Sequence, residues 1–151
     1  MKKSKHFEIH EFVCPDVYNR DGERAFRYFR PVLIGFMDWL REELDRPIFV
    51  NNWMWGGNMS QRGYRCNLCD LVKNKTGLYV SAHMLGAGID FNVKGMDPDE
   101  VRNWIKENAH RFFSIYPRYT PSIRIESDRL APTWVHLDFY EHDNPGIVYE
   151  F

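Results

Sequence analysis

Three short segments in the second half of the chain alternate between apolar and polar residues, and this pattern constrains the fold more than any other feature. Side chains of a β-strand point alternately to its two faces, so each segment predicts a strand with one apolar and one polar face. A sheet built from such strands needs a layer over its apolar face. The segments are AGIDFNV (87–93), SIRIES (122–127) and TWVHLDFY (133–140).

Two segments with helical periodicity could supply that layer. In the first, apolar residues recur at helical spacing, but Pro31 interrupts the pattern, so we expect a turn or short helix up to Phe29 and a main helix from Pro31 to about Leu44. The second segment, MDPDEVRNWIKENAHRFF, opens with Asp97 as a capping residue, a proline in the first helical position and Glu100 to complete a capping box.

The remaining segments carry weaker signals. RPIFVNNW (46–53) is a strand candidate, and FEIHEFVCP (7–15) reads as a short extended or turn-rich segment. Residues 53–78 are rich in Asn, Gly, Arg and Cys with little periodicity, which predicts a long loop, with NLCDLVKNK (67–75) as a possible short helix. Long loops inside compact domains are usually functional.

These elements predict an α+β fold with a small, mainly antiparallel sheet that carries helices on one face and a zinc site on the other. With 151 residues, 44% hydrophobic and 16% aromatic, the chain is long enough for one packed core and too short for two ordinary domains. We therefore expect a single domain, residues 1–151, and a monomer.

Charge and cysteine content narrow the setting. Twenty basic and 21 acidic residues give a formal net charge of −1 without a basic stripe, which argues against nucleic acid as a partner. No export signal and no apolar membrane span are evident. Three cysteines cannot all pair within one chain, so a reducing compartment is expected. A cytoplasmic protein, or one released to the cell wall by a separate lysis system, fits these features.

The polar faces of the predicted strands suggest a metal site. Strand alternation places Asp90 on the polar face of its strand, and His136 and Asp138 together on the polar face of theirs. His83 precedes the first strand by a few residues. Two neutral imidazoles and one carboxylate are a ligand set for Zn²⁺, with a fourth position left for water, and such a site is suited to hydrolysis.

The same residues resemble a known family. Ser-x-His-x6-Asp in SAHMLGAGID, followed by Trp-x-His-x-Asp in WVHLD, is similar to the zinc D-alanyl-D-alanine carboxypeptidases and L-alanyl-D-glutamate endopeptidases, which share a fold with lysostaphin and hedgehog. GYR at 63–65 and the opening HFEIHEFVC also resemble segments of that family, in the same order. The four segments span most of the chain.

The resemblance implies that His83, Asp90 and His136 are the zinc ligands and that Arg65 steadies a carbonyl oxygen or carboxylate of the substrate. It implies a hydrolase, a zinc metallopeptidase acting on the D-amino-acid-containing stem peptides of peptidoglycan, as a carboxypeptidase or an endopeptidase. The size of the chain also suits a phage or prophage endolysin. Arg65 has an alternative structural reading, as an arginine that anchors the loop through backbone carbonyls.

One position departs from the family pattern. Several relatives carry a glutamate three residues before the second histidine ligand as general base, and here that position is Thr133. Glu126 is our preferred base, because strand alternation sends it to the face of His136. Asp138 is the other candidate for the base, or it orients an imidazole instead. Glu126 could also be a solvated strand residue paired with Arg124 or another neighbour. The departure keeps open a second function, a zinc- or peptide-binding protein without catalysis.

The cysteines raise one more possibility. Cys66 and Cys69 have the Cys-x2-Cys spacing of half a structural zinc site, and Cys14 with His10 or His6 could supply the rest. A regular second ligand pair is missing. Buried thiols that pack the long loop against the N-terminal segment are therefore the preferred interpretation.

Overall fold

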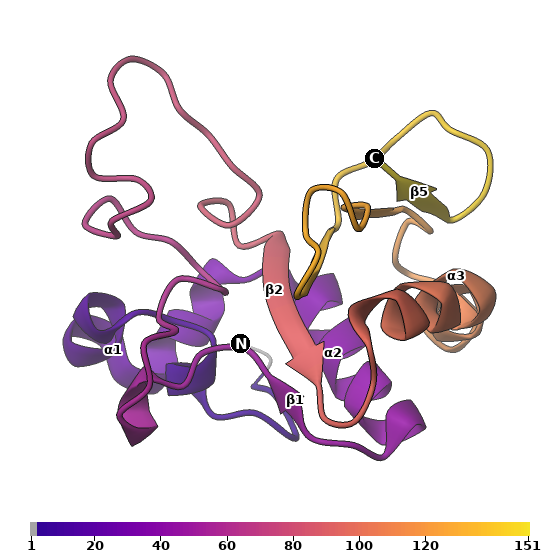
Figure 1. The fold of residues 1–151 in the computed structure, drawn as a ribbon, viewed down its shortest axis with the longest axis horizontal. Coiled ribbons are helices and arrows are strands. Elements are labelled where there is room, and N and C mark those ends of the chain that lie inside the picture. The colour runs from indigo at the N-terminus through magenta and orange to yellow at the C-terminus, as the bar shows by residue number, and fades with distance from the viewer. Residues whose placement is uncertain (1–2) are drawn as a thin grey trace.

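The computed structural model describes residues 3–151 and has an α+β architecture (Figure 1). Its α-helices are α1 (Pro15–Asp21), α2 (Pro31–Leu44) and α3 (Pro98–Ile115). Short 3-10 helices are η1 (Ile9–Glu11), η2 (Gly22–Tyr28) and η3 (Trp53–Trp55). The strands are β1 (Ile48–Phe49), β2 (Gly88–Val93), β3 (Ile123–Ile125), β4 (Val135–Asp138) and β5 (Val148–Glu150).

The five strands form one mixed sheet in the order β1-β2-β4-β3-β5. The pairs β1/β2, β2/β4 and β4/β3 are antiparallel, whereas β5 joins β3 in parallel. The predicted mainly antiparallel sheet is thus confirmed. Strand β5, which follows the two predicted strands β3 and β4, was not predicted from the sequence. Alternation within β5 is weak and its residues are only partly buried, so the segment carries no clear strand signal.

Helices α2 and α3 cover the apolar face of the sheet. The inward side chains of β2 and β4 are buried in the same core as the apolar residues of both helices. The Phe36 ring of α2 lies 5.5 Å from the Phe139 ring at the end of β4 and 5.2 Å from the Phe112 ring of α3, measured between centroids. Because one side chain touches both other elements, the two helices lie on the same side of the sheet.

Both predicted helix starts are confirmed. Helix α2 begins at Pro31, and α3 begins after Asp97, whose carboxylate accepts a hydrogen bond from the Asp99 amide at 2.9 Å. Glu100 returns the contact by accepting from the Asp97 amide at 2.7 Å, which completes the capping box. These reciprocal bonds satisfy amides that a helix N-terminus leaves unpaired.

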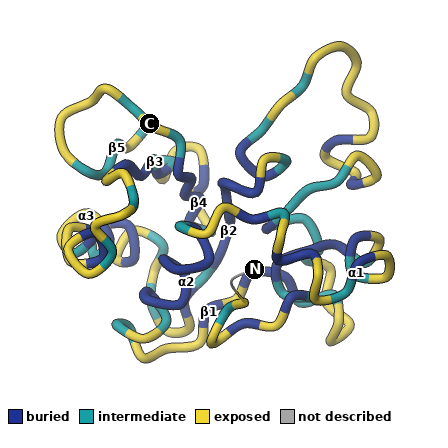
Figure 2. The backbone as a smooth tube through the Cα atoms, turned by 180° about the vertical axis from the view of Figure 1, so that it is seen from behind, coloured by how far each residue is buried: buried dark blue, intermediate teal, exposed yellow. Residues whose placement is uncertain are grey.

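Between η3 and β2 the described chain contains no helix or regular strand, and this long loop projects from the body of the molecule (Figure 1). The expected short helix at 67–75 was wrong, since this stretch consists of turns. Much of the outer part of the loop is exposed (Figure 2). The predicted long loop is confirmed. It is longer than expected, because it continues to residue 87.

Within residues 3–151, none of the helices has both the length and the apolar character needed to cross a membrane.

Candidate metal centre

Three buried side chains converge on the polar side of the sheet. Asp90 of β2 lies directly opposite His136 of β4 in the strand register, so both side chains leave the sheet on the same face. His83 joins them from the turn before β2. These residues are 4–7% exposed, and each offers a ligand atom within 4.8 Å of the other two. The predicted convergence of the three residues is therefore present in the structure.

The turn before β2 directs His83 back over the sheet. The amides of Ala87 and Gly88 both donate to the Ala82 carbonyl, at 2.8 and 3.0 Å. Gly86 has a φ of +62°, and a Cβ atom there would lie 1.9 Å from the backbone oxygen of Tyr28. This position requires glycine for both its backbone conformation and its close packing.

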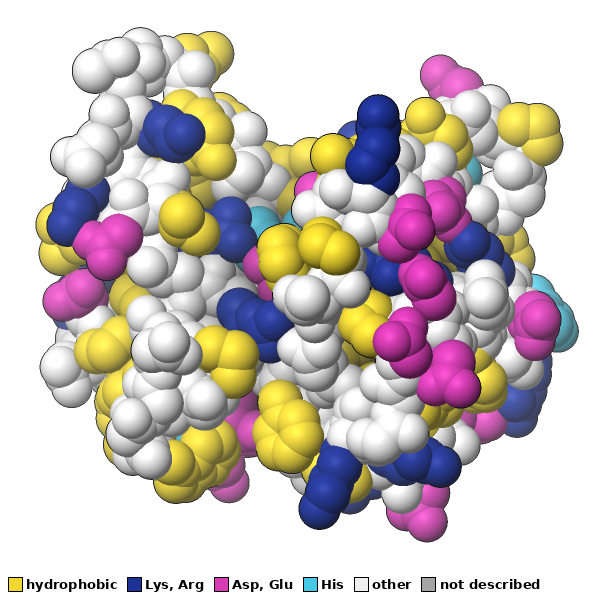
Figure 3. Space-filling view, in the orientation of Figure 1, with side chains coloured by type: hydrophobic (Ala, Val, Ile, Leu, Met, Phe, Trp, Pro, Cys, Tyr) yellow, Lys and Arg dark blue, Asp and Glu magenta, His cyan; other side chains and the backbone are white. Residues whose placement is uncertain are grey.

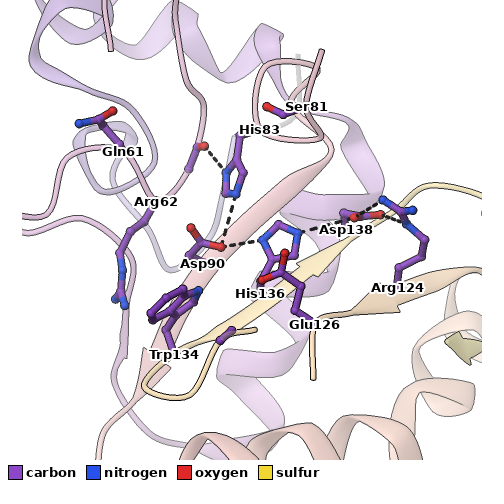
Figure 4. A network of polar contacts seen from close by, with 12 residues as sticks. Gln61, Arg62, Ser81, His83, Asp90, Arg124, Glu126, Trp134, His136 and Asp138 are labelled. Atoms are coloured by element: carbon purple, nitrogen blue, oxygen red, sulfur yellow. Dashed lines mark hydrogen bonds and ion pairs between the residues drawn. The ribbon is translucent and has the colours of Figure 1, made fainter. Parts of the chain in front are cut away.

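Hydrogen bonds fix the orientation of the two imidazoles (Figure 4). His83 Nδ1 lies 2.8 Å from the Gly63 carbonyl oxygen, which can only accept, so this nitrogen donates and Nε2 is left to face Asp90 Oδ1 at 3.4 Å. His136 Nδ1 lies 2.6 Å from the same Asp90 oxygen. Two ring nitrogens and one carboxylate oxygen therefore meet at one point.

A second layer of charged groups holds this trio. Asp138 Oδ2 lies 3.6 Å from His136 Nε2, on the side of the ring away from Asp90. Arg124 donates to both oxygens of Asp138, at 2.9 and 2.7 Å. On the other side, Arg65 donates to Asp90 Oδ2 at 3.0 Å. Carboxylates that orient ligand histidines, and groups that orient ligand carboxylates, are typical surroundings of metal sites.

The charges of the trio follow from these contacts. Burial alone would raise the pKa of Asp90, but hydrogen bonds from His136 and His83 outweigh it and hold that pKa well below its usual range. Burial disfavours the charged form of His136, yet its contacts with Asp138 and Asp90 raise its pKa to about 9. The pKa of Asp138 is lowered to about 2, because its bonds with His136 and Arg124 outweigh burial. Both carboxylates are therefore ionised at neutral pH.

The donor set fits a zinc ion. Tetrahedral Zn²⁺ with nitrogen and oxygen ligands at about 2.0–2.2 Å separates its ligand atoms by about 3.3–3.5 Å. The 3.4 Å between His83 Nε2 and Asp90 Oδ1 matches this, and the 2.6 Å between His136 Nδ1 and Asp90 Oδ1 would have to widen by less than about 1 Å. A small side-chain movement is enough to admit the ion.

The trio lies in a pocket of about 380 Å³. In the space-filling view this pocket is a hollow between the long loop and the C-terminal segments, with histidine visible at its floor (Figure 3). Besides the trio and Asp138, its walls include charged and aromatic side chains. These are Arg65, Arg124, Glu126, Tyr79, Trp134 and Phe151.

All six residues singled out from the sequence line this pocket: His83, Asp90, His136, Asp138, Arg65 and Glu126. The Glu126 carboxylate lies beside the His136 ring (Figure 4). Thr133, by contrast, is exposed in the turn before β4, where its carbonyl oxygen accepts a hydrogen bond from Asn92 at 2.7 Å.

Sequence reasoning missed the role of Arg124. Strand alternation indicated that Arg124 shares a face with the site, but it suggested Glu126 as the partner rather than Asp138. The register, in which Arg124 lies opposite Asp138, decides the pairing. Strand alternation could place Arg124 on this face, but only the register between β3 and β4 identifies its partner.

Comparisons of the chain with protein-family models, with curated proteins and with solved structures found no match. Functional assignment therefore rests on the geometry of the site and on the motif segments.

Proposed function

We propose that this protein is a zinc-dependent peptidase that hydrolyses the D-amino-acid-containing stem peptides of peptidoglycan. The observation that carries the proposal is the convergence of His83, Asp90 and His136 at the floor of a pocket. The resemblance of SAHMLGAGID, WVHLD, GYR and the N-terminal segment to the zinc carboxypeptidases and endopeptidases of the cell wall supports it.

In this proposal the trio holds Zn²⁺ through His83 Nε2, Asp90 Oδ1 and His136 Nδ1, the atoms that meet in the structure. A zinc ion at such a site supplies Lewis acidity and lowers the pKa of a coordinated water. Asp138 keeps the His136 ring oriented, and Arg65 restrains Asp90. Burial of all three ligands strengthens the electrostatic interactions among them.

The walls of the pocket suit a peptide with a free carboxylate. The guanidinium groups of Arg65 and Arg124 both line it, and their nitrogens that are not bonded to Asp90 or Asp138 can donate to a substrate carboxylate. Their side chains are 15% and 29% exposed, so each retains access to the pocket. Tyr79 and Trp134 offer apolar surface for short side chains such as alanine. A terminal D-alanine is the substrate group that this combination fits best.

Glu126 is the proposed general base. It lies beside His136 in the pocket but is not part of the trio, so it is free to accept a proton from the attacking water. The main chain fixes its position, because the Glu126 amide donates to the His136 carbonyl at 3.2 Å. Asp138 is less suited to this role, since Arg124 occupies both of its oxygens.

The test is digestion of purified muropeptides by metal-stripped protein and by protein reloaded with saturating Zn²⁺, followed by mass spectrometry. We expect cleavage only with zinc, and the mass lost identifies a terminal D-alanine or an internal bond. His136→Ala should abolish cleavage and lower the zinc content by one equivalent per chain. The matched control, His110→Ala, changes an exposed histidine of α3 and should retain both.

A second candidate function is a protein that binds the zinc or the stem peptide without cleaving it. The observation that favours it is Thr133, which is exposed and does not line the pocket at the position where several relatives carry the base. Calorimetry with intact muropeptides separates the two functions. Saturable binding without any product at full zinc loading would establish the binding protein.

A further inference from the structure

The three cysteines meet at a second place, away from the histidine site. Cys14 Sγ lies 3.6 Å from Cys66 Sγ, and Cys66 Sγ lies 3.7 Å from Cys69 Sγ. All three sulfur atoms lie within 4.8 Å of one another. Cys14 and Cys69 are buried, and Cys66 is half-buried. The predicted packing of thiols between the loop and the N-terminal segment is therefore present.

We propose that Cys14, Cys66 and Cys69 bind a second metal ion of the zinc class through three thiolates. Tetrahedral Zn²⁺ with Zn–S bonds of about 2.3 Å separates its sulfur ligands by about 3.8 Å, and the measured separations of 3.6 and 3.7 Å need almost no adjustment. A disulfide requires about 2.05 Å and would leave the third thiol unpaired. Soft thiolate ligands select zinc over magnesium or calcium.

The structure also leaves room for a fourth ligand. Cys66 lines a small pocket of about 80 Å³ together with the exposed Asp16. A water molecule occupies about 30 Å³ in the liquid, so this pocket admits a water or the Asp16 carboxylate. Arg20 lines the same pocket and offsets part of the negative charge of three thiolates. His10 and His6, the partners considered from the sequence, are not part of this cluster.

A cross-link would stabilise the long loop, because the loop buries little of its own apolar surface. The side chains of Leu68, Leu71 and Leu78 are 58%, 52% and 97% exposed. Among residues 67–75, only Cys69 and Val72 are buried in the core. Cys14 and Cys66 are 52 residues apart in the chain. A metal that joined them would restrain the loop where apolar packing is sparse.

The cross-link would end directly beside the histidine site. The segment before Cys66 contacts that site at several points: the Arg62 carbonyl accepts from the Asp90 amide at 2.7 Å, Gly63 accepts from His83, and Arg65 donates to Asp90. Fixing Cys66 would therefore hold in place the backbone that orients two of the three histidine-site ligands. The thiolate site is a positioning device and does not depend on the proposed peptidase activity.

Cobalt substitution tests the proposal, because Co²⁺ bound by thiolates shows a sulfur-to-cobalt charge-transfer band in the near ultraviolet that nitrogen and oxygen ligands do not give. Reduced, full-length protein should bind two Co²⁺ per chain and show this band. Cys66→Ser and Cys14→Ser should each lose the band and one equivalent of metal. His83→Ala should also bind only one equivalent but retain the band.

The wild-type spectrum needs no variant, so a cysteine substitution that prevents folding leaves the test intact. Absence of the band from reduced wild-type protein at saturating Co²⁺ overturns the proposal. So does a stoichiometry of one that His83→Ala reduces to zero. Loss of the histidine-site metal alone, with the band preserved, would instead contradict the proposed function and leave the thiolate site standing.

Discussion

At the residue scale, the contact between Asp138 and His136 should strengthen metal binding by the trio. Asp138 is 1% exposed and lies 3.6 Å from His136 Nε2 while Arg124 holds both of its oxygens. Asp138→Asn removes the charge that orients the imidazole, and such changes typically weaken metal binding about 10- to 100-fold. Competition with a chromophoric chelator measures this. The control Asp128→Asn, at an exposed turn position, should leave affinity unchanged.

Replacement of Glu126 should affect hydrolysis and leave metal affinity unchanged. Because it lies beside the site without belonging to the ligand trio, Glu126→Gln should retain zinc and lose about 10²-fold or more of hydrolysis. Rates on muropeptides at saturating zinc, with metal content determined on the same samples, check this. Glu107→Gln, an exposed change in α3, is the control. Full activity of Glu126→Gln would transfer the role to Asp138 or to no protein group.

The residues of the site were largely predictable because alternation along a strand is a local property. It placed Asp90, His136 and Asp138 on the polar face without knowledge of the partner strands. The pairing of Arg124 with Asp138 was not predictable, since it depends on the register between β3 and β4. The contact of Gly63 with His83 likewise joins residues 20 positions apart across a loop without periodicity.

At the element scale, Arg102 of α3 ties the helix to the turn between β3 and β4. This side chain is 2% exposed, and its guanidinium donates to the carbonyls of Glu126 at 2.9 Å and Trp134 at 2.7 Å, and to that of Ala131. These carbonyls belong to the connection between β3 and β4, which begins at Glu126. The sequence predicted the helix but not the buried arginine on it that holds the connection between β3 and β4.

Replacement of Arg102 by methionine keeps much of the side-chain volume and removes all of these donors. Carbonyls left buried without partners should lower the free energy of unfolding by about 3 kcal/mol. Urea unfolding measures the loss. Arg111→Met, on the same helix, removes an ion pair with Glu43. The Arg111 side chain is 47% exposed, so this change should lower the free energy of unfolding by less than about 1 kcal/mol. Equal losses in the two variants would contradict the bracing role of Arg102.

The elements that escaped prediction are the short ones. Helix α2 spans 14 residues and α3 spans 18, long enough for periodicity and capping signals to be read. Helix α1 has only seven residues, PDVYNRD, most of them poor helix formers, and the burial of Val17 indicates that tertiary packing supports it. Strand β5 depends on pairing with β3 more than 20 residues earlier, which no local pattern reveals.

At the scale of the whole molecule, the two candidate metal-binding groups lie on either side of one segment of the long loop. Arg62, Gly63 and Arg65 bond to His83 or Asp90, while the next residue, Cys66, belongs to the cysteine cluster. The loop has few buried side chains beyond these contacts, so we expect its stability to depend on charge and metal binding more than on the apolar core. The proton on His136 is then a direct probe of that dependence.

The proton on His136 makes the stability of the folded protein depend on pH. The pKa of His136 is about 9 in the folded, metal-free protein and about 6.5 in an unfolded chain, so folded protein binds more protons between these values. The contribution of His136 is therefore fully present below pH 6.5 and is lost as pH rises toward 9, by up to about 3 kcal/mol. Zinc, which needs the neutral imidazole, should remove this loss by displacing the proton.

Urea unfolding of wild-type and His136→Asn protein across this pH range, with a chelator present, isolates the effect. Other ionisable groups contribute equally in the two proteins, so their contributions cancel in the difference between the two free energies of unfolding. That difference should shrink as pH rises from 6.5 to 9, and His110→Asn should follow the wild type. A difference that stays constant or grows with pH would show that Asp90 and Asp138 do not hold a proton on His136, and the charge assignment of the site would have to be reversed.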